Sequence, residues 1–201
     1  ADIPVIAQRK YVEYFEYQER LPGHFARRNA IWAGEPLPSG PQPPITSFRE
    51  EPTVFFIDNY EYELGGFHFK MVHTPGETPD HTTIWVPELK AVFIGDNYFK
   101  YFINNSTFRG TLIRPVLGYI NALDKALALR PEFFLPGHDT PVVSRTVIQN
   151  KVGKFRDALR YIHDETVRGI NAGKAPFTLR QEVTVPEKYG IREGFGKVDW
   201  T

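Results

Sequence analysis

Cysteine is absent from this 201-residue sequence, which excludes disulfides, thiolate zinc sites and a cysteine nucleophile. Histidine, aspartate and glutamate therefore remain as the only good metal ligands. An excess of one charge is also missing, because 24 basic and 24 acidic residues give zero net charge, so no overall field points to nucleic acid or an anionic membrane. No apolar run approaches the roughly 18 residues of a membrane-spanning helix, and the first residues lack a signal-peptide pattern, which leaves the compartment open.

What the sequence does contain is enough apolar material for one sizeable core, at 41% hydrophobic and 14% aromatic residues. Short apolar runs between turn residues predict strands at 1–7, 53–57, 67–72, 82–86, 91–94 and 132–135. Helical spacing predicts helices at 8–20, 25–32, 112–129 and 146–171, and a short one at 178–183. The proline- and glycine-rich stretch 34–44 predicts an extended surface loop.

Ionisable side chains stand where the predicted strands stop: His73, Glu77, Asp80, His81, Asp96 and His138. Loop positions held by a rigid sheet are where catalytic and metal-binding groups are usually placed. Glu77, Asp96 and His138 are separated by 19 and 42 positions, so only folding can bring them together, and a shared metal ion is one reason to do so. Two carboxylates and an imidazole suit zinc or another divalent ion. Taken singly, each residue is better explained as a turn former or a hydrogen-bonded polar group, and only the set favours a metal site.

Three motifs at these positions resemble those of the metallo-β-lactamase fold hydrolases: His73-Thr-Pro-Gly-Glu-Thr-Pro-Asp-His81, Gly95-Asp96 and Pro136-Gly137-His138. Glutamate in the Pro-Gly-Glu motif is similar to the alkylsulfatase (dodecyl-sulfate hydrolase) branch, and residues 26–28, 108–110 and 161–168 also look like that branch. The resemblance implies an α+β fold. Residues 1–145 would form the second half of a metallo-β-lactamase-like αββα sandwich, and residues 146–201 would begin a helical, dimerisation-like region, which implies a homodimer.

The resemblance also implies a binuclear zinc site. Glu77 and His138 would each bind one of two zinc ions, and Asp96 would bridge or face both. Asp96, His81 and Arg109 are then the expected catalytic side chains. His81 would stand behind the ligands or face the substrate.

The same resemblance suggests how an anionic substrate is held. Arg109, Arg114 and Asn97 are the expected substrate-binding residues, because arginine holds a sulfate or phosphate group well. A surface ion pair is the alternative for both Arg109 and Arg114. His73 is explained either as a core histidine or as a residue that orients Glu77.

Two departures from the family pattern matter. Asp96 follows Gly95, whereas the alkylsulfatase branch usually has glutamate in an Ala-Glu-Asn setting, so the exact substrate stays open. The signature His-x-His-x-Asp-His, which supplies most of both zinc sites in the family, does not occur in this sequence. We therefore expect an internal piece of a larger enzyme, its site completed by an upstream segment or chain that carries the motif.

The expected function is metal-dependent hydrolysis of a small-molecule ester, an alkyl sulfate or a related compound. Motifs at the metal do not report the substrate, so a thioester or lactone hydrolase of the same superfamily is an alternative. A catalytically silent binding or scaffold module is the alternative from another class, because three ligands alone bind zinc weakly.

Overall fold

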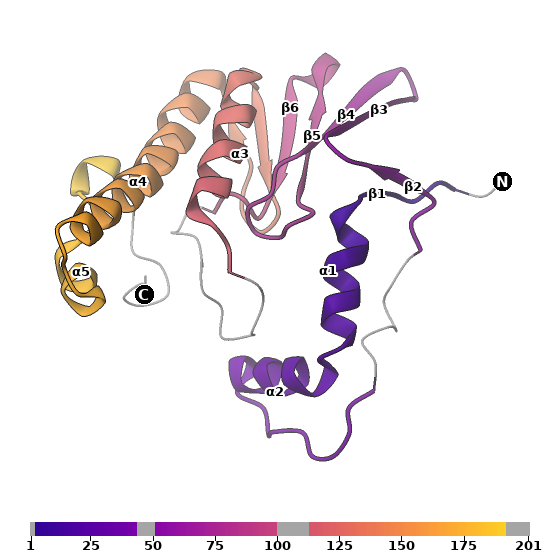
Figure 1. The fold of residues 1–201 in the computed structure, drawn as a ribbon. Helices are drawn as coiled ribbons and strands as arrows, with labels where there is room; N and C mark the ends of the chain where they lie inside the picture. Colours follow the sequence, from indigo (N-terminus) through magenta and orange to yellow (C-terminus); the bar gives the residue numbers. More distant parts are fainter. Residues whose placement is uncertain (1–2, 44–50, 100–112, 192–201) are drawn as a thin grey trace.

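The computed structural model describes residues 3–43, 51–99 and 113–191 and shows an α+β fold (Figure 1). Its main sheet has six strands in the order β3-β4-β5-β6-β7-β8. These strands are β3 (Asn59–Leu64), β4 (Phe67–His73), β5 (Thr82–Val86), β6 (Ala91–Gly95), β7 (Phe133–Pro136) and β8 (Val142–Val143). Neighbouring strands are antiparallel except β6 and β7, which are parallel. The predicted strands at 67–72, 82–86 and 91–94 are thus confirmed as three sequential antiparallel neighbours.

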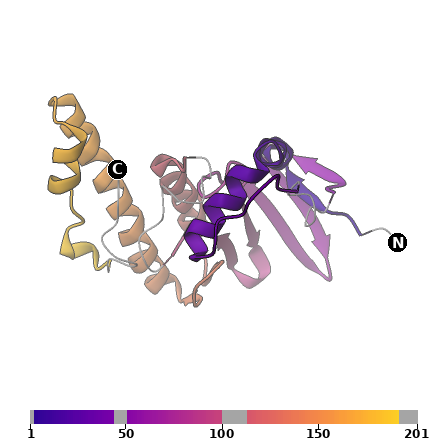
Figure 2. The same ribbon diagram turned by 90° about the horizontal axis from the view of Figure 1, so that it is seen from below.

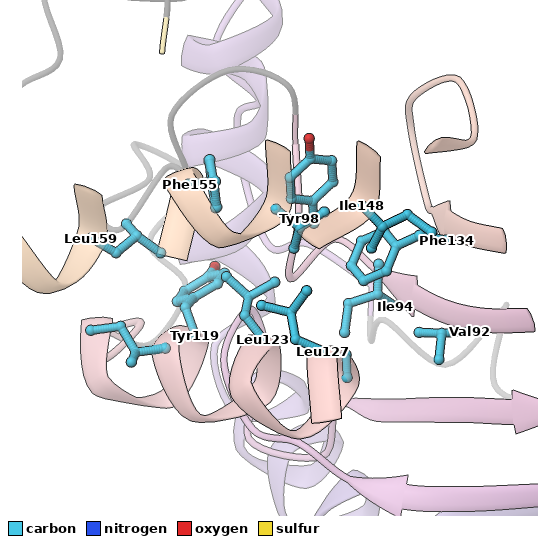
Figure 3. Packing of buried hydrophobic residues seen from close by; sticks show 13 residues of the cluster. Val92, Ile94, Tyr98, Tyr119, Leu123, Leu127, Phe134, Ile148, Phe155 and Leu159 are labelled. Atoms are coloured by element: carbon cyan, nitrogen blue, oxygen red, sulfur yellow. The ribbon is translucent and has the colours of Figure 1, made fainter. Parts of the chain in front are cut away.

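Two helices cover one face of this sheet. The parallel pair β6 and β7 needs a crossover, which α3 (Val116–Ala128) provides, and α4 (Arg145–Asn171) packs beside α3. The core between helices and sheet is built from three groups of buried side chains (Figure 3): Val92, Ile94 and Phe134 from the strands, Tyr119, Ile120, Leu123 and Leu127 from α3, and Ile148, Val152, Phe155 and Leu159 from α4. This packing fixes where α3 begins relative to the ends of the strands.

The opposite face of the sheet is open in the described part of the chain. Side chains alternate along a strand, so Phe93 and Phe133 point away from the helices, and both remain about two-fifths exposed. The described residues thus form one helical layer and one sheet layer, with a small sheet beside them. This arrangement agrees with the expected second half of an αββα sandwich.

The N-terminal elements are loosely attached to the main sheet. β1 (Ile6–Gln8) pairs in parallel with β2 (Val54–Phe56) in a separate two-stranded sheet. α1 (Lys10–Glu19) buries no residue, and α2 (Pro22–Ala33) buries only Phe25. Pro22 begins α2, and Gly34 ends it in the left-handed conformation that glycine adopts without strain. Figure 1 shows both helices projecting below the sheet.

The C-terminal elements lie at the other end of the molecule from the N-terminus (Figure 2). α5 (Pro176–Glu182) folds back on the end of α4, and a short 3₁₀ turn follows at Glu187–Tyr189. Another 3₁₀ turn, Pro87–Leu89, connects β5 to β6 in the main sheet. The first half of α4 contributes to the core of the main sheet, so the division of the chain at residue 145 stays a prediction. None of the described helices combines the length and apolar character needed to cross a membrane.

The helix predicted from residue 112 begins later. α3 starts at Val116, because Pro115 is its extended N-cap residue, and Ile113 lies outside the helix with 90% of its surface exposed. Helical spacing of apolar residues had included Ile113, which was wrong. Two strands were not predicted. β8 has only two residues, and β3, which pairs with β4, alternates charged and aromatic side chains, so both give a weak strand pattern.

Candidate functional site

Three loops that carry the predicted site residues meet at one edge of the sheet. β4 and β6 are both antiparallel to β5, so they run in the same direction, and β7 is parallel to β6. The carboxyl ends of these three strands therefore lie at the same edge. Glu77 follows β4, Asp96 follows β6 and His138 follows β7.

Glu77 is held at both its backbone and its carboxylate. Its backbone N–H donates to Asn97 Oδ1 at 2.9 Å. Its Oε1 accepts a 2.6 Å bond from Arg114 Nη2, in an ion pair whose side chains are 22% exposed for Glu77 and 8% for Arg114. Arg114 stands just before α3, and its guanidinium lies close to the hydroxyl of the buried Tyr119, whose pKa is raised by burial. The start of α3 therefore determines where the Glu77 carboxylate points.

Asn97 lies completely buried beneath the Glu77 loop. Besides accepting from Glu77, its amide donates to the Thr74 carbonyl at 2.8 Å and lies 3.1 Å from His81 Nδ1. Gly76 allows this approach, because a Cβ there would stand 2.3 Å from Asn97 Oδ1. Asn97, expected to bind substrate, has no exposed surface here and instead fixes the loop.

His81 is oriented inside the protein. Its Nδ1 lies 3.1 Å from Thr74 Oγ1, and Thr74 Oγ1 bonds Thr83 Oγ1 at 2.7 Å. Burial lowers the pKa of His81 to about 4, so the imidazole is neutral at pH 7. A neutral ring can accept the Asn97 amide proton at Nδ1. His73 contacts the Pro79 carbonyl through Nε2 at 2.8 Å, which ties down the far end of the same loop.

Asp96 and His138 form a second pair at this edge. His138 Nδ1 lies 2.7 Å from Asp96 Oδ1, with the Asp96 side chain 20% exposed and His138 70% exposed. Phe99 stacks on the imidazole with ring centres 5.8 Å apart. The structure thus brings Asp96 and His138 into contact at this edge. Arg109, expected in catalysis and substrate binding, lies outside the described residues.

The donor set of this edge matches the ligands of zinc and other divalent ions. Within the described residues, however, no three histidine, aspartate or glutamate side chains converge into a group that could hold a metal ion. Asp80 Oδ1, in the same loop as Glu77, is buried and has no hydrogen-bond partner in the described part of the chain. Glu77, Asp96 and His138 therefore fit as part of a metal site that needs further ligands.

Three residues that shape this edge were not singled out from sequence: Thr74, Gly118 and Tyr119. Gly118 lies inside α3, and a Cβ there would stand 2.6 Å from the Pro75 carbonyl oxygen. A glycine within a helical pattern is a signal of close packing that could have identified it. Thr74 and Tyr119 carry no comparable local signal, because their roles depend on contacts with distant residues.

Comparison with known proteins identifies the family of this chain. The model of the metallo-beta-lactamase superfamily matches residues 2–138. A linear primary-alkylsulfatase of Pseudomonas sp. is 30% identical over 153 residues, which cover 73% of this chain and 29% of that protein. An alkyl/aryl-sulfatase of Saccharomyces cerevisiae is 25% identical over 154 residues, covering 72% of this chain and 24% of that protein.

Solved structures show the same fold. The stereoselective inverting sec-alkylsulfatase Pisa1 from Pseudomonas sp. superposes with a TM-score of 0.77 at 19% identity, over 92% of this chain and 32% of that one. The chain thus spans under a third of the length of the relatives described here. With a family model that matches more than half of its residues, the chain belongs to the metallo-beta-lactamase superfamily.

Proposed function

We propose that this chain forms part of a metal-dependent hydrolase that cleaves an alkyl sulfate or a related ester. The observation that carries the proposal is the meeting of Glu77, Asp96 and His138 at one edge of the sheet, on the ends of β4, β6 and β7. The similarity to alkylsulfatases supports the choice of substrate class.

In this proposal Glu77, Asp96 and His138 hold metal, taken as two zinc ions in the complete site. When bound, zinc supplies Lewis acidity, which lowers the pKa of water and polarises an ester oxygen. The other residues of the edge keep the ligands in place. Asn97 fixes the backbone of the Glu77 loop, and His81, as a neutral ring, braces the same loop from inside.

The remaining ligands would come from a segment or chain that carries His-x-His-x-Asp-His, which is not in this sequence. Arg109 would hold the anionic group of the substrate, because a guanidinium can bind a sulfate through two parallel hydrogen bonds.

A Glu77→Ala variant tests this function in the purified protein, together with the polypeptide that completes its metal site. Zinc content by elemental analysis and sulfate release from dodecyl sulfate are the measurements. We expect activity to fall below detection and about one metal ion per site to be lost, because one donor disappears. Glu61→Ala is the matched control, since Glu61 is exposed on β3 and pairs with Lys70. Full activity and metal content in Glu77→Ala would contradict the proposal.

One observation favours a second candidate, a catalytically silent binding or scaffold module. Glu77 and Asp96 each already contact a cationic or hydrogen-bonding side chain, and no complete three-residue metal group exists in the described ranges. Such a module would remain folded and bind its partner without zinc. Equilibrium dialysis against zinc separates the two, because only the hydrolase takes up metal stoichiometrically.

A further inference from the structure

Arg114 is the most enclosed charged side chain of the site. Only 8% of its side chain is exposed, and its Nη2 donates to Glu77 Oε1 at 2.6 Å. A residue that binds a diffusing substrate must present its guanidinium to solvent before the substrate arrives. Arg114 instead directs it toward a proposed metal ligand.

The surroundings of Arg114 hold it in this orientation. It lies close to the hydroxyl of Tyr119, which is 1% exposed and belongs to the core between α3 and α4. The first turn of α3 also packs against the Glu77 loop, because Gly118 lies directly beneath the Pro75 carbonyl. Arg114 is therefore anchored to the rigid helical layer and not to a surface loop.

The form of the ion pair leaves part of the carboxylate available. Arginine can hold a carboxylate through both oxygens, but here the contact joins Nη2 to Oε1. Within the described residues, Glu77 Oε2 makes no hydrogen bond. A single contact of this kind limits rotation of the carboxylate and still leaves one oxygen to bind an ion.

We infer that Arg114 is a positioning residue that acts through Glu77, by directing its carboxylate toward the metal, and is not a substrate-binding residue. The inference rests on the proposed function, in which Glu77 binds zinc. Partners that orient a metal ligand typically change metal affinity by about 10- to 100-fold when they are removed. A substrate-binding arginine would instead change KM.

The test measures zinc affinity by competition with a chelator, and kcat and KM for dodecyl sulfate, in the protein with its complete site. Arg114→Met should weaken zinc binding by about 10- to 100-fold and lower kcat, with KM within about threefold of the parent. Arg114→Lys keeps a cation near Glu77 and should recover part of the affinity. Tyr119→Phe, a conservative change, should weaken zinc binding by a smaller factor in the same direction.

Arg156→Met is the matched control. Arg156 lies on α4, donates to Asp124 at 2.6 Å and has 26% of its side chain exposed, so its loss removes a partly buried, ion-paired arginine away from the site. It should leave zinc affinity unchanged even where it lowers thermal stability. If Arg114→Met does not fold, Arg114→Lys and Tyr119→Phe carry the test.

Each outcome decides between the two roles. Parent-like zinc affinity in the folded Arg114 and Tyr119 variants, with KM raised in Arg114→Met or Arg114→Lys, would overturn the inference and return Arg114 to substrate binding. In that case the parent protein still binds zinc and cleaves the ester, so the proposed function survives. A parent protein that takes up no zinc and cleaves no ester would refute the proposed function, and the inference with it.

Discussion

Replacing Asn97 with alanine should destabilise the protein strongly, because the side chain is buried and hydrogen-bonded on several sides. Its amide joins the Glu77 N–H, the Thr74 carbonyl and the His81 ring. Alanine removes the acceptor at 2.9 Å and the donor at 2.8 Å and offers nothing in their place. No water replaces the amide easily, because the site is completely buried.

The magnitude follows from the groups left behind. A buried neutral donor or acceptor without a partner costs about 1–3 kcal/mol, and two such backbone groups remain, so we expect a loss of about 2–6 kcal/mol. This is a large share of the roughly 5–15 kcal/mol that stabilises a typical domain. Asn97→Asp keeps an acceptor for the Glu77 N–H but buries a charge against the Thr74 carbonyl, so it should cost at least as much.

Urea unfolding followed by tryptophan fluorescence and far-UV circular dichroism measures this loss. Asn121→Ala is the control, because Asn121 is exposed on α3, close to the same loop, and should change the free energy of unfolding by no more than about 0.5 kcal/mol. A loss below about 1 kcal/mol in Asn97→Ala, with an unchanged slope against urea, would refute the reasoning. It would mean that the Glu77 loop finds other partners at no cost.

Two further predictions concern helix packing and pH. Gly118→Ala should lower the free energy of unfolding by about 1–3 kcal/mol through its clash with the Pro75 carbonyl of the Glu77 loop, whereas Gly153→Ala in α4, where an added Cβ meets nothing within 4 Å, should raise it by up to about 1 kcal/mol. Equal changes in both variants by denaturant unfolding would contradict the close contact. Burial lowers the pKa of His81 to about 4 in the folded protein. The stability that the neutral ring contributes is therefore complete above the unfolded pKa of 6.5 and is lost as the pH falls toward 4. His68, whose pKa the neighbouring Glu88 carboxylate raises, should titrate above 6.5 by NMR, and titration of both rings near 6.5 would refute these environments.

Much of the fold could be predicted because its signals are local. Alternating apolar residues and a turn at each end define β4, β5 and β6, and residues 145–171 repeat their apolar positions at helical spacing. The start of α3 was misplaced because Ile113 fits the apolar pattern, and only the chain geometry at Pro115 shows that the helix begins later. A two-residue strand such as β8 has too little pattern to predict.

Part of the candidate site could also be predicted from the sequence, and part could not. The motifs around Glu77, Asp96 and His138 could be recognised because they combine turn residues with metal-binding side chains over a few positions. Their meeting at one edge could also be expected, since residues at the ends of strands that run in the same direction gather there. Which groups touch each other could not be predicted. Asn97, expected to bind substrate, is fully buried and hydrogen-bonds the Glu77 loop, which no local pattern indicates.

The amino-acid sequence alone determined the kind of chemistry available: no thiolates, two carboxylates and an imidazole at strand ends, and a pattern of elements that indicates the α+β fold. Only the tertiary structure decided how those groups are used. The Glu77 carboxylate meets an arginine 37 positions away, and its backbone meets an amide 20 positions away. Contacts over such separations depend on how α3 and the sheet pack, and short-range periodicity carries no information about that packing.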